Sequence, residues 1–162
     1  DSLSGTPKRV AKMYVQEIFK GLNPENHPVC RTFNNTYEYG EMLVEKDINL
    51  NSTCEHHFLP IAGRAHLAYK SSGQVIGLSK INRLVDFYAK RPQVQERLTR
   101  QIAEALKAIL DTEDVAVIIE AKHMCVSSRG IEDEQSSTVT ADYHGAFKKN
   151  EARREFLDHI RG

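Results

Sequence analysis

The sequence predicts one α+β domain whose strands pair mainly antiparallel. Its 162 residues and its hydrophobic content of 40% suit a single globular domain. Hydrophobic residues recur at helical spacing in some segments, and in others they alternate or run together as in strands. The segments come in the order helix, two strands, two helices, two strands, helix, without internal repeats. We therefore expect a four-stranded antiparallel sheet with two mid-chain helices and a helix near each end.

The first half of the chain is predicted to hold one helix and two strands. Thr6 is expected to cap the helix, Pro7 fits its first turn, and the helix is expected to end near Gly21. Strands are predicted over residues 42–50 and 58–70, the second because polar and apolar residues alternate along it.

The second half begins with two amphipathic helices. The first is predicted over residues 75–91 and ends before Pro92, and the second covers residues 94–110 with a continuous apolar stripe. A third amphipathic pattern predicts a last helix over residues 150–161.

Two further strands complete the predicted sheet. Residues 115–126 are rich in β-branched side chains and predict a buried strand, and residues 136–143 predict a fourth strand. A twisted four-stranded sheet leaves two edges free to pair. We therefore expect oligomerisation through these edges.

Charge and cysteine usage exclude several classes of protein. The 22 Lys and Arg residues balance the 22 Asp and Glu residues, so no overall field attracts nucleic acid or an anionic membrane. No apolar stretch approaches the roughly 20 residues that cross a bilayer. The 3 cysteines are too few for a disulfide framework and indicate a reducing compartment. We expect a cytoplasmic protein without nucleic-acid or membrane partners.

Two short segments concentrate side chains that bind metals. Cys54, His56 and His57 lie close together, and His123 and Cys125 lie two apart, where a strand would point both the same way. Zinc favours thiolate and imidazole, and a catalytic site uses three protein ligands and a water. Paired CxxC motifs of a closed structural site are absent. The residues alone favour an open zinc site; the alternative is core cysteines beside loop histidines.

Longer blocks of sequence extend these motifs over almost the whole chain. TPKRVAKMY is followed in order by STCEHHFLPIAGRAHLAY, VIGLSKINRLVDFYAKRPQVQERLT and HMCVSSRG. Together they resemble the GTP cyclohydrolase I family. The resemblance implies the tunnelling fold, in which sheets of five subunits join into a barrel and two rings stack into a homodecamer. It also implies one catalytic domain over residues 1–162, with a helical arm over 1–40 and a core over 41–162.

The resemblance further implies a role for each site residue. Zinc would be held by Cys54, His57 and Cys125. Protons would be moved by His123 and His56, with Ser79 assisting at the ribose. The guanine edge would be held by Glu96, aided by Gln95 or nearby backbone. Ribose and triphosphate would meet the side chains of Ser79, Lys80, Arg83, Arg129 and Arg9.

The implied reaction converts GTP and water into 7,8-dihydroneopterin triphosphate and formate. Water adds at C8, the imidazole ring opens, formate leaves, and the ribose rearranges and closes on the exposed amine. Zinc lowers the pKa of a bound water toward about 7, and a histidine with a pKa of about 6.5 moves protons at N7. A carboxylate accepts both adjacent N–H groups of guanine, and arginine forks suit phosphate oxygens.

Several residues have alternative interpretations that involve no ligand. Charged residues on amphipathic helices are more often solvated than bound to a ligand, which applies to Glu96, Lys80 and Arg83. Arg129 before Gly130 is also typical of a turn. Other residues match no motif: Cys30 is predicted in the core or a loop, His66 on a surface or interface strand, and no role is predicted for His27, His144 and His159.

Two rival functions stay open from the sequence. The first keeps the fold but stops the reaction at the ring-opened formamide nucleotide, and release of formate with pterin fluorescence discriminates it. The second is a structural zinc module or regulatory binding protein. The presence together of Cys54, His56, His57, His123 and Cys125 disfavours this second function.

Overall fold

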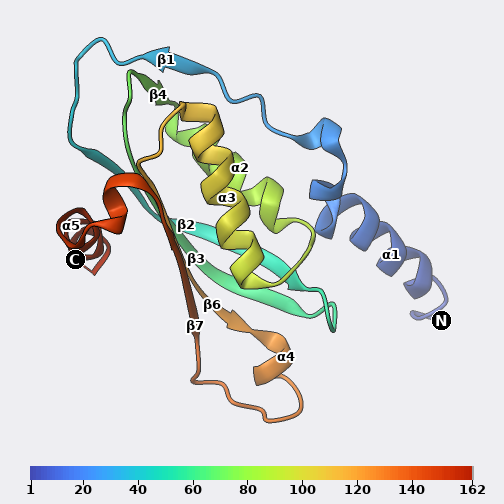
Figure 1. The fold of residues 1–162 in the computed structure, drawn as a ribbon. Coiled ribbons are helices and arrows are strands. Elements are labelled where there is room, and N and C mark those ends of the chain that lie inside the picture. Colours follow the sequence, from blue (N-terminus) through green and yellow to red (C-terminus); the bar gives the residue numbers. More distant parts are fainter. Residues whose placement is uncertain (162) are drawn as a thin grey trace.

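A computed structural model describes residues 1–161 and has an α+β fold built on one curled sheet (Figure 1). The sheet has the strand order β5-β2-β3-β6-β7, with all neighbours antiparallel except β5 and β2. Its strands are β2 (Met42–Cys54), β3 (Pro60–Lys70), β5 (Pro92–Gln93), β6 (Val115–His123) and β7 (Thr138–Tyr143). The predicted four antiparallel strands are thus confirmed, with β5 added at one edge.

Two short strands form a separate ribbon that the sequence did not predict. β1 (Thr32–Asn34) pairs antiparallel with β4 (Gln74–Ile76). β4 occupies the start of the segment predicted as a helix from residue 75, because Gly77 separates it from the helix proper. β1 lies in the predicted N-terminal arm, so this arm is joined to the core by strand pairing.

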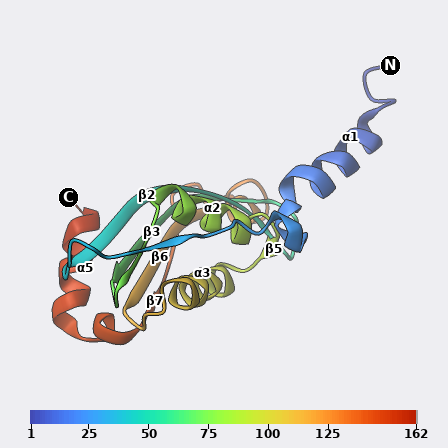
Figure 2. The same cartoon turned by 90° about the horizontal axis from the view of Figure 1, so that it is seen from above.

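Helices cover both faces of the sheet (Figure 2). α2 (Leu78–Ala89) and α3 (Gln95–Leu110) bury their apolar stripes on one face, in a core that includes Leu84, Leu98 and Ile119. On the other face, α5 (Asn150–Arg161) and the preceding turn bury Phe147 and Phe156 against Met42, Ala68, Ala116 and Ile118. Residues 65–69 of β3 and 115–119 of β6 are therefore buried on both faces of the sheet.

The N-terminal helix α1 (Thr6–Met13) projects away from the sheet, as Figure 2 shows. The prediction that Thr6 caps it is wrong, since the helix already includes Thr6 and Gly5 is the N-cap residue, without a side-chain hydrogen bond. No residue of α1 is buried, and Val10 is 42% exposed on the face predicted to be apolar. The helix continues as a π-helical turn (Tyr14–Ile18), whose Tyr14 hydroxyl donates to the carbonyl oxygen of Phe58 at 3.0 Å.

β6 ends earlier than the sequence predicted. The strand ends at His123, and a short helix, α4 (Met124–Ser127), follows. The expectation that residues 123 and 125 are neighbours on one face of a strand is therefore wrong. The Ser127 hydroxyl is 3.4 Å from the His123 carbonyl and the Ser128 hydroxyl is 2.6 Å from the Met124 carbonyl, local bonds that compete with strand pairing.

Two further expectations concern single residues and the membrane. His66 is not a surface residue, because only 8% of it is exposed and its Nδ1 accepts a hydrogen bond from the Asp47 N–H at 3.2 Å. Within residues 1–161, no helix is both long enough and apolar enough to span a bilayer.

Candidate active site

Three side chains from three elements meet at one end of the sheet. Cys54 is the last residue of β2, His57 lies in the turn to β3, and Cys125 lies in α4. Their two Sγ atoms and one imidazole nitrogen all lie within 4.8 Å of one another. Strand register explains this meeting: Thr53 pairs with Pro60, and Ile61 pairs with His123, so the ends of β2 and β6 flank the start of β3.

The donor set fits a zinc ion. Two thiols and an imidazole are the soft and borderline donors that zinc favours, and three protein ligands leave one position of a tetrahedral set open. Within residues 1–161, this is the only such group of three or more metal-binding side chains, and it leaves out His56 and His123. The three residues grouped by geometry are therefore the same three that were predicted to bind the metal.

Local charges also matter for metal binding here. Burial raises the pKa of the Cys125 thiol, and the neighbouring Cys54 thiol raises it further. Thiols bind metals as thiolates, so a metal must displace these protons. The Arg129 guanidinium lies 3.3 Å from Nε2 of His57, which places a positive charge beside the three ligands.

His123 is held by a buried glutamine on the first turn of α3. Its Nε2 lies 2.8 Å from Oε1 of Gln95. The Gln95 amide nitrogen donates to the carbonyl oxygens of Ile119 at 3.1 Å and Thr138 at 2.9 Å, so Oε1 must be the acceptor toward His123. His123 therefore carries its proton on Nε2 when neutral, which leaves Nδ1 as its basic nitrogen.

The predicted guanine contact Gln95 is buried and makes several hydrogen bonds within the protein. Gln95 is only 2% exposed, and its amide is used by the sheet and by His123. Its nitrogen also contacts the Thr140 hydroxyl at 3.1 Å, and Thr140 contacts the Thr99 hydroxyl at 2.7 Å. Both atoms of the Gln95 amide thus have partners within the protein, one of them His123, and the predicted contact of Gln95 with guanine stays a prediction.

Comparison with known proteins identifies the family of this chain. The family model described as GTP cyclohydrolase I matches residues 1–161. A protein of Flavobacterium johnsoniae named GTP cyclohydrolase 1 is 65% identical over 161 residues, which cover 99% of this chain and 72% of that protein. The chain belongs to the GTP cyclohydrolase I family. It is an enzyme of this class.

Other matches support the family and the fold. Proteins named GTP cyclohydrolase 1 from Aeromonas salmonicida and Yersinia enterocolitica are 53% and 54% identical, over 100% and 99% of this chain and 75% and 74% of their own length. A crystal structure of the archaeosine synthase QueF-Like, in the apo form, matches 67% of this chain and 98% of its own with a TM-score of 0.56. At 16% identity this likeness shows the fold alone.

Two more of the site residues expected for a GTP cyclohydrolase I lie at this end of the sheet. Glu96 is exposed on the first turn of α3, where its negative charge raises the pKa of His123 against the stronger lowering by burial. His56 is exposed, with Nδ1 3.8 Å from Sγ of Cys54. An exposed histidine thus lies beside one candidate ligand, and a carboxylate lies near His123.

The remaining predicted residues are not brought to this end. Ser79 and Lys80 lie at the start of α2 and Arg83 at its middle, whereas its last residue, Ala89, accepts from the Ser52 hydroxyl near Cys54 at 2.7 Å. Ser79 is therefore about 15 Å along the helix from that contact, at 1.5 Å per residue. Arg9 is held within the arm by the Ser2 carbonyl and the Thr6 hydroxyl, both at 2.9 Å.

Proposed function

We propose that this protein is a zinc-dependent GTP cyclohydrolase I that converts GTP and water into 7,8-dihydroneopterin triphosphate and formate. The observation that carries the proposal is the group of Cys54, His57 and Cys125 beside a histidine whose proton position is fixed. Family membership supplies the substrate class, and the site supplies donors suited to metal-assisted hydrolysis.

The three candidate ligands would hold Zn²⁺ and leave one coordination position open. When bound there, zinc supplies a Lewis acid that makes water nucleophilic at neutral pH, as attack at C8 of the purine requires. Arg129 beside His57 would meet the negative charge of the triphosphate.

His123 would carry the protons of ring opening. Because Gln95 accepts from Nε2, Nδ1 is the nitrogen that takes up a proton and returns it to the substrate. His56, which is exposed beside the ligands, would be the second proton carrier. Glu96 would accept the two adjacent N–H groups of guanine, and adenine would leave this carboxylate unpaired.

A second copy of the chain would complete the site. Ser79, Lys80, Arg83 and Arg9 are remote from the candidate ligands within one chain, and β7 is an open sheet edge whose Val139 is 61% exposed. Edge pairing into a five-subunit tunnelling-fold barrel, and stacking of two barrels into a homodecamer, would bring basic residues of a neighbour to the zinc. That residues 1–162 form one catalytic domain is also part of this proposal.

Incubation of the purified protein with GTP and Zn²⁺ tests the function. We expect pterin absorbance and fluorescence to rise together with formate, and both to stop after a chelator removes the metal. Mass spectrometry of the product distinguishes this reaction from one that stops at the ring-opened formamide nucleotide. Accumulation of a ring-opened nucleotide without formate would contradict the proposed function.

A further inference from the structure

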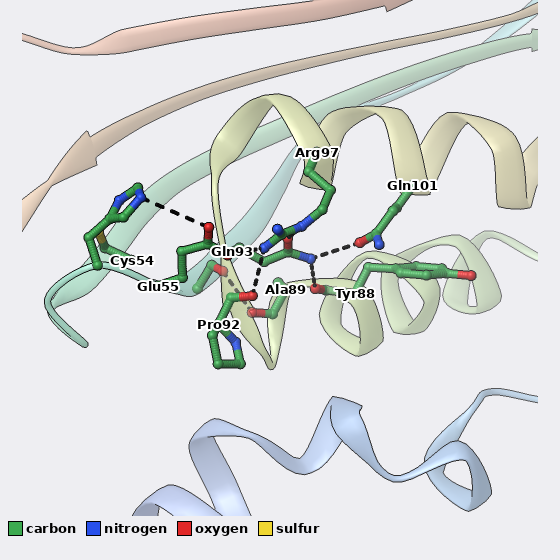
Figure 3. Close-up of polar contacts among 10 residues, drawn as sticks. Cys54, Glu55, Tyr88, Ala89, Pro92, Gln93, Arg97 and Gln101 are labelled. Carbon is green, nitrogen blue, oxygen red and sulfur yellow. Dashed lines mark hydrogen bonds and ion pairs between the residues drawn. The ribbon is translucent and has the colours of Figure 1, made fainter.

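An ion pair ties the turn that carries the candidate zinc ligands to the first turn of α3. Glu55 lies directly after Cys54, and its Oε2 accepts from Nη2 of Arg97 (Figure 3). The Glu55 N–H also donates to the carbonyl oxygen of Gln93 at 3.0 Å. Both the backbone and the side chain of Glu55 are therefore fixed by the segment that leads into α3.

Arg97 is oriented before it meets Glu55. Its Nε donates to Oε1 of Gln93 at 3.0 Å, and its Nη2 also donates to the Pro92 carbonyl at 3.0 Å. These acceptors and the Glu55 carboxylate surround one planar guanidinium, as Figure 3 shows. A guanidinium group whose donors are held in this way points one N–H group at the carboxylate in a fixed direction. The flexible ammonium group of a lysine would not be fixed in this way.

Gln93 is the rigid base of this arrangement. It is 0% exposed, and its Nε2 donates to the Tyr88 carbonyl and to Oε1 of Gln101, both at 2.9 Å. Donation to a carbonyl fixes the amide orientation, so Oε1 of Gln93 is left to accept from Arg97. In the sheet, Gln93 of β5 pairs with Cys54 of β2. Arg97, Gln93 and Cys54 thus form a chain of direct neighbours.

We propose that Glu55 and Arg97 are positioning residues that set the candidate zinc ligands in register with the first turn of α3. That turn carries Gln95, which holds His123, and Glu96, the predicted guanine contact. The consequence for turnover rests on the proposed function. The consequence for metal binding follows from the place of Glu55 between Cys54 and His57. Residues that orient metal ligands through hydrogen bonds typically change metal affinity or activity by about 10- to 100-fold.

The positioning role explains the Glu55–Arg97 ion pair better than a contribution to global stability does. The Arg97 and Glu55 side chains are 43% and 33% exposed, and ion pairs in such positions add little to the free energy of unfolding. Glu55 Oε1 also lies 3.9 Å from Nε2 of His56, so its carboxylate stands between His56 and Arg97. Loss of Arg97 would free the carboxylate to move toward the candidate ligands.

The experiment compares Glu55→Gln, Arg97→Gln, the double variant and Arg97→Lys with the wild-type zinc protein. Arg100→Gln is the matched control, because Arg100 is an exposed arginine on the next turn of α3. Zn²⁺ release to a colorimetric chelator, kcat and KM with GTP, and the midpoint of urea unfolding are measured for each protein at one protomer concentration.

We expect Glu55→Gln and Arg97→Gln each to speed zinc release about tenfold and to lower kcat by a similar factor. The losses in zinc retention and kcat should be no larger in the double variant than in the more impaired single variant, because both substitutions remove the same interaction. Arg97→Lys should recover part of the loss. The urea midpoint of Glu55→Gln should match that of Arg100→Gln, because this substitution leaves the bonds of Arg97 to Gln93 and Pro92 in place.

Three results would overturn the proposal. The first is wild-type zinc release and kcat in both single variants, and the second is additive losses in the double variant. The third is a loss in Glu55→Gln that tracks a lowered urea midpoint and so reveals a merely structural role. If the wild-type protein binds zinc without converting GTP, the proposed function fails, and zinc release alone still decides the positioning role.

Discussion

The two ends of the long strands hold different parts of the proposed active site. At the end formed by the β2–β3 turn, α4 and the start of α3, one chain alone brings Cys54, His57 and Cys125 within 4.8 Å of one another. At the other end, where β4 leads into α2, Ser79, Lys80 and Arg83 lie apart from any candidate ligand (Figure 1). Strand register within one chain therefore gathers the candidate ligands, whereas the proposed phosphate contacts on α2 would need a second chain to reach such a group.

Substitutions at the ligand end should have the largest effects, and these should be of two kinds: loss of zinc together with turnover, and loss of turnover alone. Cys125→Ala should lose zinc and all measurable turnover, because two donors remain of a three-donor set. His123→Ala should keep zinc and lose about 10²- to 10⁴-fold in kcat, as expected for a proton carrier. Zinc analysis of the two purified variants, with GTP turnover, measures both effects. Equal zinc content in the two proteins would contradict this division of roles.

Mixed oligomers provide a sharper comparison of the two ends. His123→Ala damages the ligand end, and Arg83→Ala removes a charge from the middle of α2. If each site takes these residues from different chains, a mixture of the two variants, unfolded and refolded together, should regain activity in about a quarter of its sites, when assayed at a GTP concentration too low for Arg83→Ala alone to turn over. Each variant refolded alone is the control. No gain on mixing would mean that both residues act within one chain.

Gln95 allows a comparison of kinetic constants between the ends. Gln95→Leu should lower kcat by about ten- to a hundredfold with little change in KM, because it misplaces His123 by a small distance. Arg83→Ala should instead raise KM for GTP, since it weakens binding of the triphosphate. Steady-state kinetics with zinc-loaded proteins measure both. A raised KM with unchanged kcat in Gln95→Leu would return Gln95 to the role of a substrate contact.

Most of the fold could be predicted because the long elements carry a repeating pattern. α2, α3 and α5, together with β2, β3, β6 and β7, have enough residues for apolar periodicity to be visible. β5 has 2 residues and β1 has 3, so no period exists to detect, and their pairing is decided by tertiary contacts. α4 was missed because serine hydroxyl groups bond locally where β-branched composition favoured a strand.

The candidate site was predictable to a smaller extent. Spacing indicated two segments with five candidate metal donors, and the resemblance selected Cys54, His57 and Cys125 among them. The part of Gln95 could not be found, because its partners Ile119 and Thr138 come from strands that are distant in sequence. A polar residue at the first turn of a helix is usually solvated, and only the packing of α3 on β6 and β7 reverses this.

The smallest expected effect lies away from both ends, at the irregular pairing of β2 between Glu45 and Ile48. There Nδ1 of His66 accepts from the Asp47 N–H, and burial lowers the pKa of His66, while the carboxylates of Asp47 and Glu120 act in the opposite direction. Below a pH of about 6.5 the unfolded chain binds a proton at this histidine that the folded chain resists, so stability falls as pH decreases.

His66→Asn isolates this contribution, because asparagine can accept from the Asp47 N–H but does not titrate. Urea midpoints of both proteins are measured at pH 7.5 and pH 5.5 and at one protomer concentration, since oligomer stability depends on it. The wild-type midpoint should fall more than that of the variant over this range, while zinc content stays equal in the two proteins. Equal falls would assign the acid sensitivity to other groups, such as those at the ligand end, where protons compete with zinc for the same donors.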